Sequence, residues 1–557
     1  MLTARSRTNE ALGLHHRNIA ARASPSWVDP LAWFFLALGA AVRILAYLGN
    51  PSLSIDESYL ALNLIQKSPA DLVRTLEFNQ AAPIGFLEAE KLVITILGRS
   101  EYALRLLPLI ASLVALFAFY LIARNLLRPL GAIVAVAAFA LLDPLIYYST
   151  TAKQYALDVF AAVIILAVGL VLEHRPVRNI DLLGLSVLGA LLVWFSHASV
   201  FALASLAALL AVCCISHRDW KRMPLLVATV GIWTASFLFE FLLTRTNLAG
   251  IISSIEPESG TLLTPAEGSA SWLDRTADHV RYLVGLEDTA TGDPVLASLP
   301  MGINRGLTML ILLVAGVGLV SLFRRRPRFA LLMATAPALA LIASAAHQYP
   351  LTGRTLLFVL PSIALCMGEG AQSLVAIGKR RKLAAIPAAA VTSSVAAIAI
   401  LPLVHVFDPR TGQEMRQALK YLGAHHRSND TLYVSAGAQY ALAYYHLCGC
   451  SDFDPRTAWS FSTTTGGRNQ RAAAVESRSP RLIIEGSSSD NAAAVTKSLI
   501  GRSRVWILLA DAPGYRREPL IDSLDGHGQR LQRFQGAGPA SIAASLYLYD
   551  LAIKSPG

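Results

Sequence analysis

Two adjacent carboxylates, Asp56 and Glu57, are the side chains in this chain best suited to acid–base chemistry. They directly follow the first long apolar segment, which places them at a membrane edge. A charged pair at such an edge costs desolvation free energy unless it has a partner or a function. The function that we infer is proton abstraction from a hydroxyl group, with a carboxylate as general base.

Further polar side chains occur at the edges of other apolar segments, and the charge pattern described below predicts that they lie on the same side of the membrane. These residues are Gln80, Lys153, Tyr155, Asp158, His197, His347, Tyr349 and Arg354. Such a cluster suits a phosphate and a sugar carried on a lipid. Cations would bind the phosphate, and hydrogen-bonding side chains would bind the sugar.

The composition excludes an ordinary soluble protein. Of the 557 residues, 54% are hydrophobic and 15% are charged, and the mean hydropathy is +0.49. A soluble domain has about 25% charged residues. The net charge of +11 would favour a nucleic-acid partner in a soluble chain. Here the positive residues lie in short loops between apolar segments, so that topology explains them and we expect no nucleic acid to bind.

Apolar segments of nearly spanning length recur along the chain and predict about eleven transmembrane helices. They lie near residues 31–49, 103–123, 130–147, 154–173, 180–195, 199–215, 224–243, 304–323, 329–346, 355–377 and 383–403. Arginine and lysine concentrate in alternate loops, for example at Arg324, Arg325 and Arg326. The positive-inside rule makes these loops and the N-terminus cytoplasmic and puts Asp56 on the outer side.

This topology divides the chain into three parts. We expect a cytoplasmic tail over residues 1–30, a transmembrane domain over 31–404 and an extracytoplasmic domain over 405–557. The transmembrane domain includes external loops over about 50–102 and 245–302. In the first loop, residues 82–98 are apolar but carry Glu88, Glu90 and Lys91, which predicts a helix lying in the membrane interface.

The C-terminal part has a different pattern. Apolar runs at 432–434, 482–484 and 505–509 predict buried strands, and residues 413–425 and 491–500 predict helices. Cys448 and Cys450 are compatible with a disulfide or with two free thiols. The predicted fold class is therefore mainly α: a polytopic membrane helix bundle with interfacial helices in its first external loop and a small C-terminal α/β domain.

These motifs resemble those of the GT-C superfamily, the integral-membrane glycosyltransferases that use polyprenyl-phosphate-linked sugars. The resemblance is to the branch of protein O-mannosyltransferases and aminoarabinose transferases, and it covers roughly residues 30–405. The matching segments are Asp56-Glu57, residues 80–87 (QAAPIGFL), residues 101–108 (EYALRLLP), Tyr148-Ser149 with Lys153-Gln154-Tyr155 and Asp158, and Gly353-Arg354. Each motif is weak alone, but their order and shared outer face are specific in combination.

The resemblance implies an inverting transfer with Asp56 as general base. Lys153 and Arg354 are the candidates that hold the leaving phosphate. Thr151 stands where many relatives carry a glutamate, and Gln80 and Ala81-Ala82 stand where a histidine often precedes the proline. Two potential metal ligands are thus missing. A divalent metal stays open as a cofactor, and we predict no other.

Each candidate also has a structural interpretation. Asp56 and Glu57 could be solvated loop carboxylates, and Glu57 could orient Asp56 instead of reacting. Lys153 could be an interface lysine whose aliphatic stem crosses apolar surface. Arg354 could be an interfacial anchor.

The residues nearer the helices have structural interpretations as well. Asp158 could pair with Gln154 one turn back. His197 and His347 could be satisfied structural histidines, and Tyr155 could belong to an aromatic belt. We interpret Glu240 as structural, paired with Arg245.

The favoured function is transfer of a sugar from a polyprenyl phosphate to an envelope glycan, lipid or protein at the outer face of a bacterial inner membrane. The compartment follows from the family resemblance. A flippase for a lipid-linked sugar is the first alternative, but transporters place charges near the bilayer midplane and use internal repeats. A catalytically silent relative that binds glycan is the second. The C-terminal domain could recognise the acceptor, cover the site or serve as a structural cap.

Overall fold

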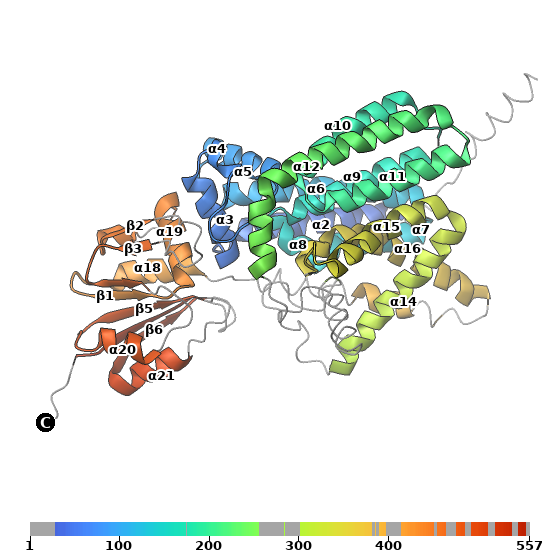
Figure 1. Cartoon of the computed structure of the whole chain (residues 1–557). Helices are drawn as coiled ribbons and strands as arrows, with labels where there is room; N and C mark the ends of the chain where they lie inside the picture. The colour runs from blue at the N-terminus through green and yellow to red at the C-terminus, as the bar shows by residue number, and fades with distance from the viewer. Residues whose placement is uncertain are drawn as a thin grey trace, which may run out of the picture.

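A computed structural model describes residues 28–173, 175–254, 301–351, 353–380, 389–396, 414–450, 454–463, 475–484, 492–510, 518–536 and 544–552, together with Leu283 and Ala385. These residues form a long helix bundle with a small sheet-containing domain at one end (Figure 1). The expected N-terminal tail and most of the expected loop at 245–302 lie outside the described residues.

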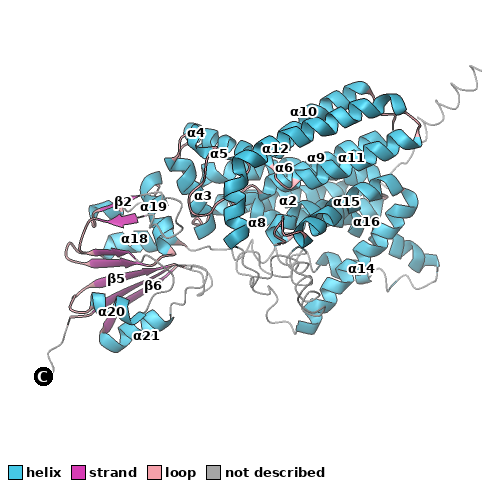
Figure 2. Cartoon of the chain, in the orientation of Figure 1, coloured by secondary structure: helices cyan, strands magenta, loops and turns pink. Residues whose placement is uncertain are grey.

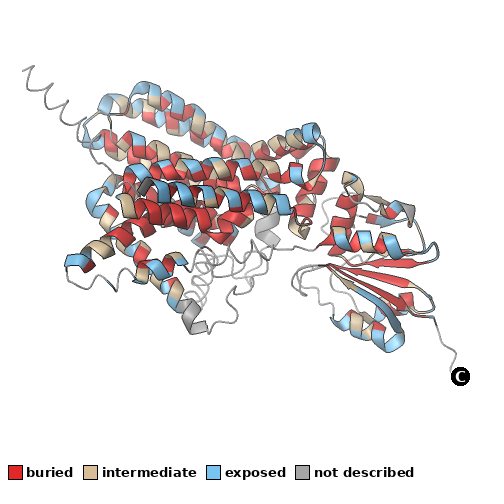
Figure 3. Ribbon diagram, turned by 180° about the vertical axis from the view of Figure 1, so that it is seen from behind, coloured by how far each residue is buried: buried red, intermediate tan, exposed pale blue. Residues whose placement is uncertain are grey.

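Eight described helices are long and apolar enough to cross a membrane. They are α2 (Val28–Gly49), α6 (Glu101–Leu126), α9 (Tyr155–Glu173), α11 (Ser199–Ser216), α12 (Met223–Ser254), α14 (Met301–Arg325), α15 (Pro327–Ala345) and α16 (Leu360–Arg380). Their exposed sides carry large apolar residues, and their buried sides face one another (Figure 3). The prediction of a polytopic helical membrane protein is therefore confirmed.

The remaining expected spans differ in detail. The segment 130–147 is bent by 53° between α7 (Pro129–Leu141) and the short helices α8 (Asp143–Tyr147) and η1 (Tyr148–Thr150). The apolar helix α10 (Asn179–Phe195) has 17 residues, just under a full crossing. The eleventh expected span, 383–403, lies largely outside the described residues.

Three short helices follow α2 and lie between the bundle and the C-terminal domain (Figure 1): α3 (Ile55–Gln66), α4 (Pro69–Leu72) and α5 (Ile84–Leu97). With 14 residues, α5 is too short to span a bilayer. It exposes Leu92 and Ile96 and buries Glu90. Burial raises the pKa of Glu90 well above its usual range, which favours the protonated, neutral acid. Glu90 is thus a buried acid and does not mark the polar side of this helix.

The C-terminal domain is built on a five-stranded mixed sheet in the order β4-β1-β5-β7-β6. Its strands are β1 (Thr431–Val434), β4 (Leu482–Ile484), β5 (Val505–Leu509), β6 (Gln529–Gln535) and β7 (Ser545–Asp550). A separate antiparallel pair joins β2 (Phe461–Thr463) to β3 (Val475–Ser477). The predicted α/β domain is confirmed, including strands β1, β4 and β5.

Helices cover both faces of this sheet (Figure 2). The helices α18 (Met415–His425) and α19 (Ala438–Cys448) pack on the face that presents Trp506 and Leu508. The helices α20 (Ala492–Leu499) and α21 (Glu518–His527) pack on the opposite face, which presents Val505 and Ile507. Successive strand residues point to opposite faces, so that β5 is buried along its whole length.

The sheet domain shares one apolar core with the first external loop. Leu60 and Leu64 of α3 belong to the same buried cluster as Ala441, Tyr444 and Tyr445 of α19. The C-terminal domain therefore packs on the segment that carries Asp56.

Within the bundle, α14 and α16 cross with their backbones almost in contact. A Cβ atom added to Gly318 would lie 1.8 Å from the Cys366 carbonyl oxygen, and one added to Gly370 would lie 1.9 Å from the Val314 carbonyl oxygen. Small residues allow such an approach between membrane helices, where packing supplies much of the association free energy.

We expect Gly318→Ala to destabilise the protein by about 1–3 kcal/mol, because the new methyl group forces these helices apart. Gly316→Ala, two residues earlier in the same helix, meets no atom within 4 Å and is the matched control. Thermal unfolding of the purified protein in one detergent compares the two. Equal midpoints would show that the close crossing contributes nothing to stability.

Candidate active site

The segment that carries the two carboxylates starts α3 with a complete capping box. The Ser54 hydroxyl accepts a hydrogen bond from the Glu57 backbone N–H at 3.3 Å, and the Glu57 Oε2 accepts one from the Ser54 N–H at 3.0 Å. This reciprocal pair determines where the helix begins. Asp56 consequently lies in the first turn, with its backbone direction set by its neighbours.

Glu57 points into the protein and is 4% exposed. Arg105 of α6 donates two hydrogen bonds to its carboxylate, both at 3.1 Å, and the Ala152 backbone N–H donates a third at 2.9 Å. Burial raises the pKa of Glu57, but the charge and hydrogen bonds of Arg105 outweigh it, so that the pKa lies below its usual range. Glu57 therefore anchors the start of α3. It is not a solvated loop carboxylate, and its buried position favours a role in orienting Asp56.

Asp56 points the other way and meets two cations. Its Oδ1 lies 3.0 Å from the Lys153 Nζ, and its Oδ2 lies 2.9 Å from the Arg354 Nη1. The Lys153 Nζ also donates to the Gln80 Oε1 at 2.5 Å. Four residues that the sequence predicted for one site, separated by up to 298 positions, thus lie together.

The electrostatics of this group favour an ionised aspartate. Burial raises the pKa of Asp56, but the charges of Lys153 and Arg354, together with hydrogen bonds from Lys153 and Gln80, lower it to about 2. Burial lowers the pKa of Lys153, which the charge of Asp56 partly offsets. The Asp56 side chain is still 36% exposed, so that it remains accessible to a reactant.

The two carboxylates have different partners. Arg105 pairs with Glu57, whereas Asp56 faces both Lys153 and Arg354. Two cations therefore adjoin the accessible carboxylate. Arginine and lysine together form a favourable environment for an oxyanion such as phosphate.

An aromatic group continues from Arg354. Its guanidinium carbon lies 5.8 Å from the centre of the Tyr155 ring, within cation–π range. Tyr148 meets the Tyr155 ring edge-on, with the ring centres 5.0 Å apart. Tyr155, one of the candidate site residues, therefore lies beside Arg354, and its ring forms a flat surface there.

A second polar group begins one turn further along α9. The Asp158 Oδ1 accepts a hydrogen bond from the Ser196 hydroxyl at 2.6 Å, and Asp158 is buried. Of the interpretations that the sequence left open, pairing with the Gln154 side chain does not occur, because Ser196 is the partner of Asp158. Ser196 is the C-cap of α10, so that this bond joins the start of α9 to the end of α10.

His197 follows Ser196 and pairs with Glu240 of α12, with the His197 Nε2 at 2.9 Å from the Glu240 Oε1. Glu240 is fully buried, and among the described residues its Oε2 has no hydrogen-bond partner. The interpretation that Glu240 pairs with Arg245 is wrong, since His197 is its partner. The sequence drew attention to Glu240 because it lies near the outer end of an apolar span. It could not identify the partner, since His197 is 43 positions away.

Two other predicted residues lie at the turn before η4 (Gly353–Val359). The Tyr349 hydroxyl donates to the Thr355 carbonyl at 2.8 Å, and its ring packs edge-on against Phe201. His347 is exposed and has a left-handed backbone with φ of 58°. No described residue connects the His347 ring to the cluster around Asp56.

The residues around Asp56 do not fit a divalent metal. Within the described ranges, no group of three or more His, Cys, Asp or Glu side chains could hold a metal ion. Both Asp56 oxygens face cations, which would repel a metal. The remaining polar partner, Gln80, already accepts from Lys153.

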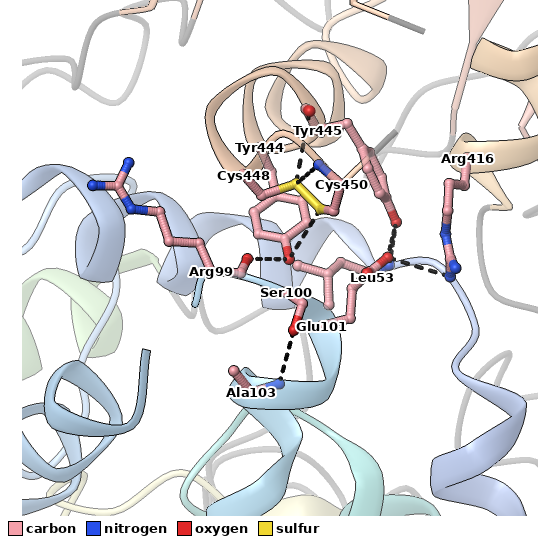
Figure 4. The surroundings of a disulfide bond; sticks show 10 residues. All are labelled: Leu53, Arg99, Ser100, Glu101, Ala103, Arg416, Tyr444, Tyr445, Cys448 and Cys450. Carbon is pink, nitrogen blue, oxygen red and sulfur yellow. Dashed lines mark hydrogen bonds and ion pairs between the residues drawn. A yellow bond between two sulfur atoms is a disulfide. The ribbon is translucent and has the colours of Figure 1, made fainter. Parts of the chain in front are cut away.

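The C-terminal domain holds the loop that precedes α3 (Figure 4). The Tyr445 hydroxyl of α19 donates to the Glu101 Oε1 at 2.7 Å and accepts from the Leu53 N–H at 3.3 Å. Arg416 of α18 lies 3.3 Å from the same Glu101 oxygen and donates to the Asn50 carbonyl at 2.5 Å. Two side chains of one domain therefore hold the loop at Asn50 and Leu53 against the start of α6.

The end of α19 is closed by a disulfide between Cys448 and Cys450 (Figure 4). The neighbouring Tyr444 hydroxyl donates to the Arg99 carbonyl at 3.0 Å. Of the two states that the sequence left open for these cysteines, the structure has the disulfide. Disulfides persist in oxidising compartments, which agrees with an extracytoplasmic domain.

We expect Tyr445→Phe to release the loop before Asp56. Losing one net hydrogen bond of about 1 kcal/mol should speed amide exchange at Leu53 by roughly fivefold. Hydrogen–deuterium exchange with peptide mass spectrometry measures this over residues 50–58. Tyr444→Phe is the control, and its effect should fall near Arg99 instead. Unchanged exchange at Leu53 would mean that the C-terminal domain does not hold this loop.

No protein-family model matches the chain, and no curated protein matches it by sequence. Its fold is similar to that of ArnT from Cupriavidus metallidurans. The crystal structure bound to undecaprenyl phosphate aligns with a TM-score of 0.52 and 12% identity, over 96% of this chain and 100% of that one. The apo structure aligns with a TM-score of 0.50 and 11% identity, over 96% and 100%.

An oligosaccharyltransferase from Archaeoglobus fulgidus, crystallised with zinc and sulfate, aligns with a TM-score of 0.47 and 13% identity, over 91% of this chain and 73% of that one. Identities at this level establish a fold and not a reaction. The described bundle and C-terminal domain together have the fold of these two ArnT structures.

Proposed function

We propose that this protein is a glycosyltransferase that moves a sugar from a polyprenyl phosphate to an acceptor hydroxyl at the membrane face that carries Asp56. The observation that carries the proposal is the arrangement of Asp56 between Lys153 and Arg354, at 3.0 and 2.9 Å. A general base and a phosphate-binding pair are the two requirements of this reaction, and here they are adjacent.

The two cations would have a role beyond holding Asp56. A donor phosphate that binds Lys153 and Arg354 would compete with the Asp56 carboxylate for them. As those contacts are shared, the pKa of Asp56 would rise from about 2 towards its usual range, which makes it a stronger base. The donor would thereby activate the residue that deprotonates the acceptor.

The proposed transfer is a single displacement with inversion. The acceptor O–H gives its proton to the Asp56 carboxylate, and its oxygen forms a bond to the anomeric carbon. The bond between that carbon and the phosphate oxygen breaks, and the electron pair leaves with the phosphate. Lys153 and Arg354 stabilise the added negative charge. Because a carboxylate is a weak base for a hydroxyl, positioning must supply much of the rate.

The second polar group, with Asp158, Ser196, His197 and Glu240, would bind hydroxyl or amino groups of the sugar. Its members are joined by short hydrogen bonds, and three of them, Asp158, Ser196 and Glu240, are buried. The similarity to ArnT, whose structure contains undecaprenyl phosphate, supports a polyprenyl donor. The acceptor would be an envelope glycan, lipid or protein, and the membrane would be the bacterial inner membrane with this face outside.

The flippase alternative fits the cluster less well. A carrier that alternates between two faces keeps its ionisable residues near the midplane. Here Asp56 lies between α2 and α6, and Lys153 lies just before α9, so that both are at one end of the bundle. The silent-relative alternative is also weaker, because Asp56 stays accessible and lies between both cations.

We expect Asp56→Asn to abolish sugar transfer, with a loss of about a hundredfold or more, while donor binding persists. Purified protein in nanodiscs is supplied with a panel of radiolabelled polyprenyl-phosphate sugars, and transfer and release are counted. Binding is measured separately with undecaprenyl phosphate, which does not require the sugar to be known. Asp56→Glu is the matched control that keeps the charge. Full turnover by Asp56→Asn would exclude this residue as the base.

Arg354→Gln should weaken binding of undecaprenyl phosphate by about tenfold, since a charge-assisted contact is lost. The same change removes one cause of the low pKa of Asp56, so that the pKa rises. The acid limb of kcat/KM should therefore move to higher pH, which a loss of folded protein alone would not produce. His347→Gln, at the neighbouring turn, is the control. An unchanged pH profile together with unchanged binding would contradict the phosphate role.

A further inference from the structure

We propose that the groove between α14 and α16 binds an anionic glycerophospholipid at the membrane face opposite to Asp56. The groove encloses a cavity of about 710 Å³. Its location follows from the helices: α14 ends at Arg325 and α16 ends at Arg380, whereas the connection from α15 to α16 carries Arg354 beside Asp56. The groove and the candidate active site are therefore at opposite ends of the bundle.

The charge at the mouth of the groove is strongly positive. Four arginines line it, Arg128, Arg324, Arg325 and Arg380, and Glu369 is the acidic residue among its lining side chains. Arg325 pairs with Glu369, which is 1% exposed and also accepts from Ser321 at 2.6 Å. Four arginines against one glutamate leave three positive charges.

All four arginines are exposed, but only Arg325 has the buried glutamate as its partner. None of the described residues forms an ion pair with Arg128, Arg324 or Arg380. They come from three helix ends, since Arg128 caps α7 and the other two lie in the last turns of α14 and α16. Guanidinium groups from separate helices can surround a phosphodiester with several donors, which a single loop cannot do as well.

The wall of the groove suits an acyl chain. Leu313, Val320 and Ile377 line it and are 61%, 52% and 50% exposed. Gly316 also lines it and leaves its surface open, since nothing lies within 4 Å of an added Cβ. An apolar wall that ends in a ring of cations complements a lipid with an anionic headgroup. Basic pockets between membrane helices on the cytoplasmic side bind such headgroups.

The partly buried polar floor explains why the groove persists. Ser373 donates to Ser321 at 3.1 Å, and Gln372 hydrogen-bonds with Glu369 while accepting from the Arg128 backbone N–H at 3.1 Å. These bonds join α7, α14 and α16 just below the rim. This junction places Arg128, Arg324 and Arg380 around one volume.

The experiment titrates the full-length purified protein in detergent with phosphatidylglycerol or with phosphatidylcholine and follows binding by native mass spectrometry. We expect the wild type to prefer phosphatidylglycerol, and Arg324→Gln with Arg380→Gln to lower its affinity about tenfold without changing that for phosphatidylcholine. Lys221→Gln, an exposed cation away from the groove, should bind like the wild type. Loss of the preference in this control would overturn the proposal.

Two further measurements distinguish binding of the lipid headgroup from binding of the acyl chain. Val320→Trp should fill the apolar wall and weaken phosphatidylglycerol binding with every arginine intact. Inorganic phosphate at the same concentration should not displace the lipid. Displacement by phosphate, or an unchanged affinity in both the arginine and the tryptophan variants, would exclude a lipid site in this groove. Thermal unfolding of each variant confirms that a loss of binding is not a loss of fold.

Discussion

The buried ion pair between Glu57 and Arg105 is the constraint that organises the membrane face described above. It joins the first turn of α3 to the first turns of α6, and its acceptor oxygens also hold the Ala152 N–H and the Ser54 N–H. One carboxylate thus connects three segments of chain. A buried pair of this kind is costly to break, because removing one partner leaves an unpaired charge in a low dielectric.

That anchor explains how two adjacent carboxylates acquire opposite roles. In the first turn of a helix, neighbouring side chains project in directions about 100° apart. With Glu57 directed into the protein, Asp56 is directed outwards to Lys153 and Arg354. Ala152 contacts the anchor through its backbone, and Lys153 follows it directly. Glu57 therefore fixes the loop at Ala152, and this loop in turn fixes the position of Lys153.

The sequence predicted those features that depend on local hydrophobicity or on the side of the membrane. Length and hydropathy predict membrane helices, and three apolar runs predict β1, β4 and β5. Asp56, Lys153, Gln80 and Arg354 could be grouped because all lie at one membrane face. The partners of Glu57, Asp158 and Glu240 could not be predicted, since Arg105, Ser196 and His197 are 48, 38 and 43 positions away. Only the packing of separate helices brings them together. Strands β6 and β7 were missed as well. Strand β6 is largely exposed and lacks an apolar run, whereas β7 is buried and its run at 546–549 was a signal that the prediction overlooked.

The link between Tyr445 and Leu53 has a consequence for how the protein is made. These residues are 392 positions apart, so that the loop before α3 emerges early in synthesis and its partner emerges after the helix bundle. A ribosome that has completed the bundle has not yet delivered α19. The early loop therefore lacks this hydrogen bond until the C-terminal domain has been made and folded. The loop that precedes Asp56 is thus held in place only in chains that include that domain.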